Sequence, residues 1–316
     1  MKRIASLPIV LFLCLSATAD ERHLRPPILG IAGVHFYSTN VKPTKDFYSQ
    51  VLGTDGAFSD ECLLCEDPPA KGSIGGPGVA HGFPVVAQLN SGQQVILSDL
   101  PTTPPQSLLY EIVFAVDNVQ EMRKYLFANG VSSEALKSAR DSYFTVTDPE
   151  GHRIGFTKAP QAKTHASGGE SSMRVIHAGI VVHDRAAEDH FYKDILGFHV
   201  YWHGGMKEGE DNWVDMQVPD GTDWIEYMLG VSPDASHKTL GVMNHIALGV
   251  PNIQAAKEQL IKNGWKGTEE PKIGRDGKWQ LNLYDPDETR VELMEFKPTK
   301  EPCCSPYTGP HPGPQQ

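Results

Sequence analysis

An internal repeat constrains this chain more than any other feature. Residues 31–37 and 46–53 match residues 175–181 and 190–197 at a constant offset of 144 residues, and further matches follow in the same order: 110–118 with 244–252, and 147–155 with 284–292. Chance does not preserve the order of several matches, so the chain consists of two homologous halves.

Each half is itself double. Four times, a short run with the composition of a β-strand precedes an amphipathic helix that ends near a glycine. We expect the helices at residues 44–52, 119–129, 186–196 and 253–263, and later strands at, for example, 213–218 and 224–229. The predicted fold is therefore α+β, built from four β-α-β-β-β modules.

Composition places the boundaries of the halves. We predict domains at residues 28–158 and 173–297, joined by a small, polar linker at 159–172. Residues 54–92 are rich in Gly and Pro and predict an insertion in the first module. Residues 298–316 contain six prolines and little to bury, so we expect a disordered tail.

The N-terminal residues predict export. Lys2 and Arg3 precede an apolar run that is too short to span a bilayer, and small residues follow it at 17–19. We expect residues 1–19 to be a signal peptide cleaved after Ala19, which places the protein in the periplasm or outside the cell.

Four cysteines remain after that cleavage: Cys62, Cys65, Cys303 and Cys304. An exported chain with an even number of cysteines favours structural disulfides over a metal site, and their connectivity stays open. The formal net charge of −11 argues against nucleic acid and anionic membranes as partners. We expect a small-molecule substrate and no membrane contact after cleavage; a homodimer is left open.

Four polar side chains occupy repeated positions in the second half. His177 and His245 lie on the first strands of the third and fourth modules, and Glu226 and Glu292 lie on the last strands, 49 and 47 residues later. If the two modules pair about a pseudo-twofold axis, the two imidazoles and two carboxylates converge. This donor set suits a divalent first-row metal with open positions for water and substrate.

Each of these residues alone has a simpler explanation. A single histidine is more often a hydrogen-bonded core residue, and a single glutamate on a strand is more often exposed to solvent. Glu226 and Glu292 are flanked by apolar residues, however, and an unpaired buried carboxylate is costly unless a cation compensates it. The repeated placement of all four favours a metal site.

Modules of this form, with His on the first strand and Glu on the last, resemble the vicinal oxygen chelate superfamily. That superfamily includes glyoxalase I, extradiol dioxygenases and the fosfomycin- and bleomycin-resistance proteins. The resemblance covers about residues 28–158 and 173–297 and implies two domains, each a mixed sheet curled into an incomplete barrel. It implies one divalent metal ion (Zn, Ni, Fe or Mn) in the second domain.

The first half departs from the pattern. Gly33, Glu111 and Gly155 stand where the second half has His177, His245 and Glu292, and the counterpart of Glu226 lies near Ile96. His35 lies two residues from Gly33, on the same strand face, but lacks supporting ligands. We therefore expect the first domain to form a wall, a lid or an oligomer contact without metal.

Glyoxalase-type members use His-Glu-His-Glu, which His177, Glu226, His245 and Glu292 match in order. The resemblance then implies a lyase or isomerase that transfers a proton through a metal-bound enediolate, with Glu292 or Glu226 as the catalytic base. Dioxygenase-type members use His-His-Glu and carry a tyrosine ten residues before the last Glu, where this chain has Asn282. An extradiol dioxygenase and a non-catalytic, bleomycin-resistance-like binding protein remain the alternatives. Export argues against a glutathione adduct as substrate.

Weaker signals surround these motifs. Residues 201–203 and Trp213 either line the cavity or pack in the core. Arg275 and Lys278 lie in a Gly-containing segment before the last strands; they could meet an anionic substrate, but a solvated loop is the favoured interpretation.

Overall fold

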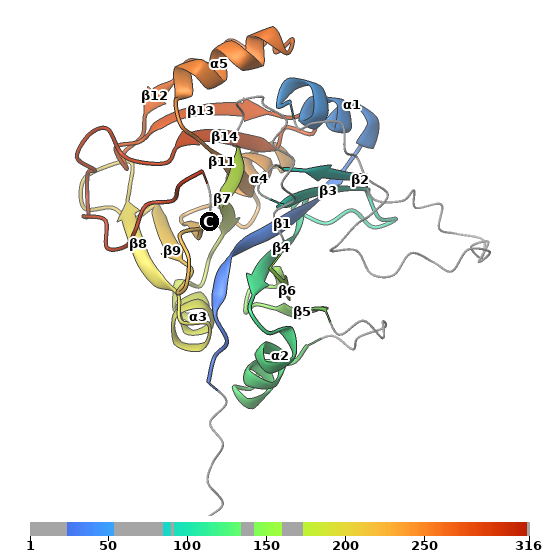
Figure 1. Ribbon diagram of the computed structural model, residues 1–316, viewed down its shortest axis with the longest axis vertical. Coiled ribbons are helices and arrows are strands. Elements are labelled where there is room, and N and C mark those ends of the chain that lie inside the picture. Colours follow the sequence, from blue (N-terminus) through green and yellow to red (C-terminus); the bar gives the residue numbers. More distant parts are fainter. Residues whose placement is uncertain (1–23, 54–84, 90–91, 134–141, 160–172, 315–316) are drawn as a thin grey trace, which may run out of the picture.

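The computed structural model describes residues 24–53, 85–89, 92–133, 142–159 and 173–314. Two mixed β-sheets with helices against them make up this part of the chain (Figure 1), which confirms the predicted α+β class. The predicted signal peptide, most of the linker, and Cys62 and Cys65 lie outside the described residues.

The first half forms a sheet of strand order β2-β3-β1-β4-β6-β5. Its strands are β1 (Ile28–Ser38), β2 (Val85–Gln88), β3 (Gln94–Asp99), β4 (Leu109–Val116), β5 (Tyr143–Thr147) and β6 (Arg153–Lys158). The insertion predicted for residues 54–92 ends too late, because strand β2 already begins at Val85. Residues 54–84 of the predicted insertion lie outside the described residues.

The second half forms a larger, curled sheet of order β12-β13-β14-β11-β7-β10-β9-β8. Its strands are β7 (Arg174–Val181), β8 (His199–Gly204), β9 (Trp213–Gln217), β10 (Trp224–Met228), β11 (His245–Val250), β12 (Lys272–Ile273), β13 (Trp279–Tyr284) and β14 (Arg290–Glu295). Both modules of this half show the predicted β-α-β-β-β order.

The four predicted helices are present: α1 (Val41–Asp46, continued by a π-helical turn to Val51), α2 (Val119–Ala128), α3 (Arg185–Asp189, continued likewise to Ile195) and α5 (Ile253–Lys262). The side chains of Asn118, Asp184 and Asn252 accept hydrogen bonds from the first turns of α2, α3 and α5. The sequence analysis missed α4 (His237–Met243), which Ser236 caps in the same way. No helix within the described residues is long and apolar enough to cross a membrane.

The modules pair as the repeat requires. In each sheet the first strands of two modules run antiparallel at the centre, β1 beside β4 and β7 beside β11. Each central strand has the last strand of its own module parallel on its other side: β3 and β6 in the first sheet, β10 and β14 in the second. This pseudo-twofold arrangement places equivalent residues of paired modules close together.

The two halves share a hydrophobic core. One large cluster of buried residues draws on both sheets, for example Ile31 and Val34 from β1 and Ala178 and Ile180 from β7. Gln93 also joins the halves, because its amide donates to the carbonyl oxygens of Ile31 and Val175, at 2.8 Å each.

The prediction of a disordered tail is wrong for residues 298–314. The backbone N–H of Thr308 donates to the carbonyl oxygen of Tyr201 at 3.0 Å, and the Tyr307 hydroxyl donates to that of Asp276 at 2.6 Å. Cys303 and Cys304 form a disulfide with each other. This segment lacks regular structure, so no periodicity announced that it packs on β8 and the β12–β13 hairpin.

Candidate metal centre

The two predicted histidines meet at the centre of the second sheet. His177 on β7 and His245 at the start of β11 lie on antiparallel neighbours, with Nε2 atoms 3.1 Å apart. A Cβ atom added to Gly179 would lie 2.2 Å from the His245 ring. Only glycine at 179 therefore leaves room for the ring of His245 across β7.

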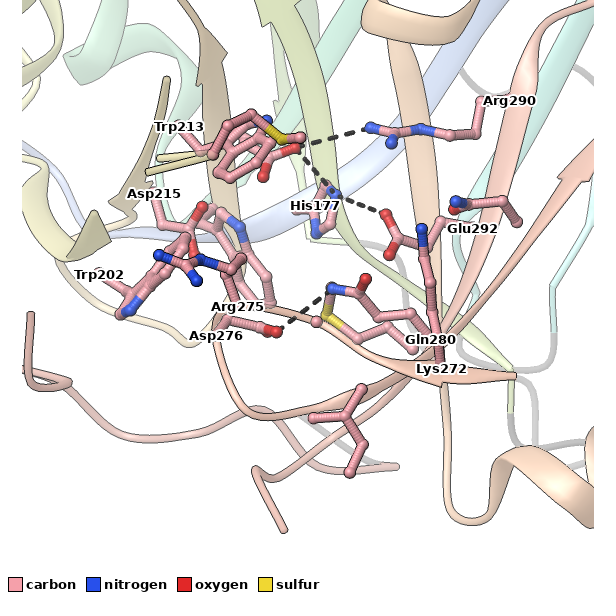
Figure 2. Close-up of a pocket in the computed structure, with 17 residues that line it drawn as sticks. His177, Trp202, Trp213, Asp215, Lys272, Arg275, Asp276, Gln280, Arg290 and Glu292 are labelled. Atoms are coloured by element: carbon pink, nitrogen blue, oxygen red, sulfur yellow. Dashed lines mark hydrogen bonds and ion pairs between the residues drawn. The ribbon is translucent and has the colours of Figure 1, made fainter. Parts of the chain in front are cut away.

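The two predicted glutamates close the cluster from either side. The Oε2 atom of Glu226 on β10 lies 3.3 Å from His245 Nε2 and 3.8 Å from His177 Nε2. The Oε2 atom of Glu292 on β14 lies 3.8 Å and 3.9 Å from the same two nitrogens. Figure 2 shows the carboxylate of Glu292 turned toward His177. The pseudo-twofold pairing thus brings all four predicted ligands together.

Burial gives this cluster its electrostatic character. His177, His245 and Glu292 are buried, whereas the Glu226 side chain keeps 14% of its surface exposed. Burial lowers the pKa of both histidines well below the usual value and raises that of Glu292 to about 7. The Nδ1 atom of His245 lies 2.8 Å from the carbonyl oxygen of Met243, which suits a tautomer whose Nε2 lone pair faces the cluster.

The donor set fits a divalent cation. Two neutral imidazoles and two carboxylates lie within a few ångströms of one another in a largely buried place, where ionised carboxylates are costly unless compensated. Three of them, His177, Glu226 and His245, present ligand atoms within 4.8 Å of one another. Nitrogen and carboxylate ligands in this mixture suit Zn, Ni, Fe or Mn.

Arg290 is one of two site residues that the sequence analysis missed. Its Nη2 atom lies 2.6 Å from His245 Nε2 and 3.8 Å from Glu226 Oε2. The guanidinium offsets part of the carboxylate charge, and it would compete with a bound metal ion for the same imidazole nitrogen. The signal was present, because the aligned segments 147–155 and 284–292 both contain an arginine, at Arg153 and Arg290.

A cavity of about 310 Å³ opens onto the cluster. Three tryptophans and two methionines form its apolar walls, and Figure 2 shows Trp202 and Trp213 on the side opposite Glu292. The sequence left open whether residues 201–203 and Trp213 line the cavity or pack in the core. Trp202 and Trp213 line it, whereas Tyr201 is buried and does not. The remaining lining includes His177, Asp215, Glu226, Lys272, Arg275, Asp276, Gln280, Asn282, Arg290 and Glu292.

Asp215 adds a carboxylate that sequence reasoning also missed. It lies directly opposite Glu226 on the neighbouring strand β9, as Asn282 lies opposite Glu292 on β13. Burial and the charge of Glu226 raise the pKa of Asp215 well above its usual value. The two modules therefore differ at this position, one having an acid and the other an amide.

The favoured interpretation of Lys278 as a solvated side chain is wrong. Lys278 is fully buried, and its Nζ atom lies 4.4 Å from the ring centroid of Trp224 and 5.1 Å from that of Tyr201. A third ring, Tyr307 of the tail, lies at 5.2 Å. Cation–π contacts and nearby carboxylates hold the ammonium group there. Arg275, by contrast, is exposed and lines the cavity.

The corresponding place in the first sheet has different contents. Ile96 pairs with His35, just as Glu226 pairs with Gly179, so the register places Ile96 at the position of Glu226. His35 Nε2 lies 2.8 Å from the hydroxyl of Ser98, and burial and Arg153 lower the His35 pKa to about 4. Of the counterparts of the four ligands, only Glu111 has a side chain that can bind a metal, and its carboxylate accepts hydrogen bonds from Tyr143 and Arg153. Within the described residues, no group of potential metal ligands includes His35.

Comparison with known proteins agrees with this geometry. The sequence model of the Glyoxalase/Bleomycin resistance protein/Dioxygenase superfamily matches residues 174–293. Comparison with curated protein sequences gives no match.

The similarity to solved structures extends beyond residues 174–293 and covers most of the chain. A room-temperature structure of an extradiol ring-cleaving dioxygenase from B. fuscum is 18% identical, with a TM-score of 0.61 over 85% of this chain and 72% of the other. An anaerobic substrate complex of homoprotocatechuate 2,3-dioxygenase from Brevibacterium fuscum, with 3,4-dihydroxyphenylacetate, is also 18% identical, with a TM-score of 0.58 over 85% and 81%.

At these identities the similarity establishes the fold, which both halves of the chain share with those enzymes. The family match covers the half in which the two histidines and two glutamates converge. Residues 174–293 therefore form a domain of the Glyoxalase/Bleomycin resistance protein/Dioxygenase superfamily.

Proposed function

We propose that this protein is an exported, metal-dependent, glyoxalase-like enzyme of the lyase or isomerase type. It moves a proton on a carbon next to a carbonyl group of a small molecule. The observation that carries the proposal is the position of Glu226, which lies against both histidines rather than turning away from them. With Glu226 included, the site has two carboxylates instead of one.

His177, Glu226, His245 and Glu292 would hold the metal. When bound, a divalent ion at this donor set acts as a Lewis acid that polarises substrate oxygens and stabilises negative charge on them. The two carboxylates match the double charge of such an ion, and this chemistry needs no electron transfer.

Glu226 is the better placed of the two carboxylates to move the proton. Its side chain is 14% exposed and lines the cavity, whereas that of Glu292 is 5% exposed. In the proposed step, Glu226 takes the proton from the hydroxyl-bearing carbon beside the carbonyl and returns it to the carbonyl carbon, while the hydroxyl proton passes to the former carbonyl oxygen. A base that both reaches the substrate and is shielded from bulk water suits this role.

The walls of the cavity support the same step. Trp202, Trp213 and Trp224 offer flat apolar surfaces, and the cavity volume of about 310 Å³ suits a small molecule. Excluding bulk water around the reacting carbon strengthens the local electrostatic interactions.

Solvent deuterium tests this proposal. The metal-loaded protein, kept without oxygen in D₂O, is incubated with a panel of α-hydroxyketones and hemithioacetals, and deuterium incorporation beside the carbonyl is followed by proton NMR. We expect incorporation or isomerisation with at least one compound, and none after removal of the metal with a chelator. Loss of substrate that occurs only with oxygen, together with no incorporation across the panel, would contradict the proposal.

Ring cleavage by oxygen is the second candidate. The observation in its favour is the similarity in fold to the extradiol dioxygenase from B. fuscum over 85% of the chain. In this alternative His177, His245 and Glu292 hold ferrous iron, and Glu226 is dispensable for holding it. Oxygen uptake by the iron-loaded protein in the presence of catechols would support this alternative.

Export is part of the proposal and has its own test. Residues 1–19 carry the features of a cleaved signal peptide. Expressed with its full sequence in a Gram-negative host, the protein should appear in the periplasm or medium with Asp20 as its first residue. A cytoplasmic product that retains Met1 would contradict this.

A further inference from the structure

The two halves meet at two equivalent seams. In one, the turn at residues 285–289 between β13 and β14 packs near α1; in the other, the turn at residues 148–152 between β5 and β6 packs near α3. The first aspartate of each turn accepts two backbone N–H groups. Asp285 Oδ1 accepts from residues 287 and 289 at 2.9 Å each, and Asp148 Oδ1 accepts from residues 150 and 152 at 3.1 and 2.8 Å.

The seams differ in the side chains that surround these turns. At the first seam, a second aspartate of the turn, Asp287, receives its hydrogen bonds from hydroxyl groups. Ser38 and Thr44 donate to its Oδ2 atom at 2.5 and 2.8 Å. At the second seam, the residue 144 positions after Thr44 is Glu188, and His152 stands where the first seam has Thr289. The hydroxyl group of Thr44 at the first seam thus corresponds to the carboxylate of Glu188 at the second, where Asp148 already provides one carboxylate.

Asp148, His152 and Glu188 form a compact cluster whose ligand atoms lie within 4.8 Å of one another. Asp148 Oδ2 lies 2.8 Å from His152 Nδ1 and accepts from the Tyr192 hydroxyl at 3.1 Å. Glu188 is fully buried; its Oε1 accepts from the backbone N–H of Glu150 at 2.9 Å. Its Oε2 is buried without a hydrogen-bond partner among the described residues.

The charge of this cluster does not balance. His152 can supply one positive charge, and it lies against Asp148, which leaves the buried carboxylate of Glu188 uncompensated. Burial and the charge of Asp148 raise the pKa of Glu188 to about 8. A buried carboxylate in this position needs a proton or a cation.

An ion could reach the cluster from a second cavity. This cavity, of about 460 Å³, lies between the halves, because Tyr37 and Tyr110 of the first half and Val181 and His183 of the second all line it. His152 lines it as well. The imidazole thus lies between the interior carboxylates and a space that solvent can fill.

We propose that Asp148, His152 and Glu188 bind a divalent first-row cation that ties the first half of the chain to the second. Two carboxylates and one imidazole are oxygen and nitrogen donors that suit Mn²⁺ or Zn²⁺. Two ligands come from the first half and one from the second, so the ion stabilises their packing. The site is separate from the cluster at His177 and does not depend on the reaction proposed there.

Manganese binding tests this site in the full chain. The His177→Ala/His245→Ala variant, which disables the other cluster, is stripped with a chelator and titrated with Mn²⁺, free Mn²⁺ being counted by electron paramagnetic resonance. We expect about one bound equivalent. Adding Glu188→Gln, which keeps the shape but removes the charge, should weaken that binding at least about tenfold.

An exposed acid on the segment that continues α3 provides the control. Asp194 forms a surface pair with His190 at 3.0 Å, so Asp194→Asn should leave the Mn²⁺ affinity unchanged. In the chain with both clusters intact, Glu188→Gln should reduce the bound Mn²⁺ from two equivalents to one, which keeps the test valid if the double variant does not fold. No binding in a folded double variant, or equal binding with and without Glu188→Gln, would overturn the proposal.

Discussion

The two sheets share one strand arrangement at their centres and differ in the side chains that occupy equivalent positions on it. In the second half, His245 on a central strand and Glu292 on its parallel neighbour belong to the cluster of converging side chains, and Glu292 lines the cavity. In the first half, Glu111 and Gly155 occupy the corresponding positions on β4 and β6. The repeat therefore preserves the strand arrangement, while a few side chains decide which groups occupy the face.

An ion pair occupies this place in the first sheet. Glu111 Oε1 accepts from the Tyr143 hydroxyl at 2.5 Å and from Arg153 Nε at 3.2 Å. A Cβ atom on Gly155 would lie 3.0 Å from the Tyr143 ring, so the tyrosine occupies the space that a glutamate side chain takes in the second half. The repeated strand arrangement therefore does not by itself imply a repeated metal site. The charged side chains at the equivalent positions decide whether such a site can form.

The largest expected contrast is between two histidines. In a Glu188→Gln background, which leaves only the second-half cluster, His245→Ala should weaken binding of Zn²⁺ or Mn²⁺ by more than about 100-fold, because losing a direct ligand costs more than losing its supporting partner. His35→Ala should change the affinity by less than about twofold. His35 contacts Ser98 and aromatic rings, not the cluster.

Calorimetric titration of the chelator-treated variants measures both affinities. Comparable losses for His35→Ala and His245→Ala would show that the face of the first sheet takes part in metal binding, and would break the contrast between the halves.

A second contrast concerns glutamates. If Glu226 is the base, Glu226→Gln should lower the rate of proton transfer by about 10²–10⁴-fold and weaken metal binding. Glu111→Gln in the first half should leave that rate within about twofold, since Glu111 serves an internal ion pair. The measurement is deuterium incorporation, with the exposed Glu210→Gln as a control for general effects.

The same Glu226→Gln variant separates the two proposed reactions. Under the ring-cleavage alternative, iron should remain bound and oxygen uptake with catechols should persist. Persistence of that activity would contradict the proton-transfer proposal.

The repeat allowed the fold and the four converging side chains to be predicted, because module pairing about an axis follows from repeated strand positions. It could not reveal Lys278, whose burial depends on rings that come from β8, β10 and the tail. It could not reveal the ordered tail either, since residues 298–314 pack through individual hydrogen bonds and have no periodicity. Such contacts exist only once the surfaces that they join have formed.

Restoring a ligand to the first half should fail. Gly155→Glu places a side chain against Tyr143 and Val113, both 3.0 Å from an added Cβ, and beside the Glu111 carboxylate. We expect it to lower the free energy of unfolding by about 1–3 kcal/mol through overpacking, without adding a metal equivalent. Lys158→Glu, at an exposed position on the same strand β6, is the matched control and should have little effect. Chemical denaturation and metal counting together would detect the opposite result, a stable variant with one more bound ion.

The smallest expected effect concerns the disulfide, which belongs to the tail that packs on the second half. Cys303 and Cys304 are adjacent, so their bond closes almost no loop, and the entropy that a disulfide removes from the unfolded chain grows with loop length. Cys303→Ser/Cys304→Ser should therefore lower the free energy of unfolding by less than about 1 kcal/mol. Tyr307→Ala, which removes a ring beside buried Lys278 and a hydrogen bond to Asp276, should cost more. A loss of about 3 kcal/mol or more in the serine variant would indicate a long closed loop, and so a pairing with Cys62 or Cys65.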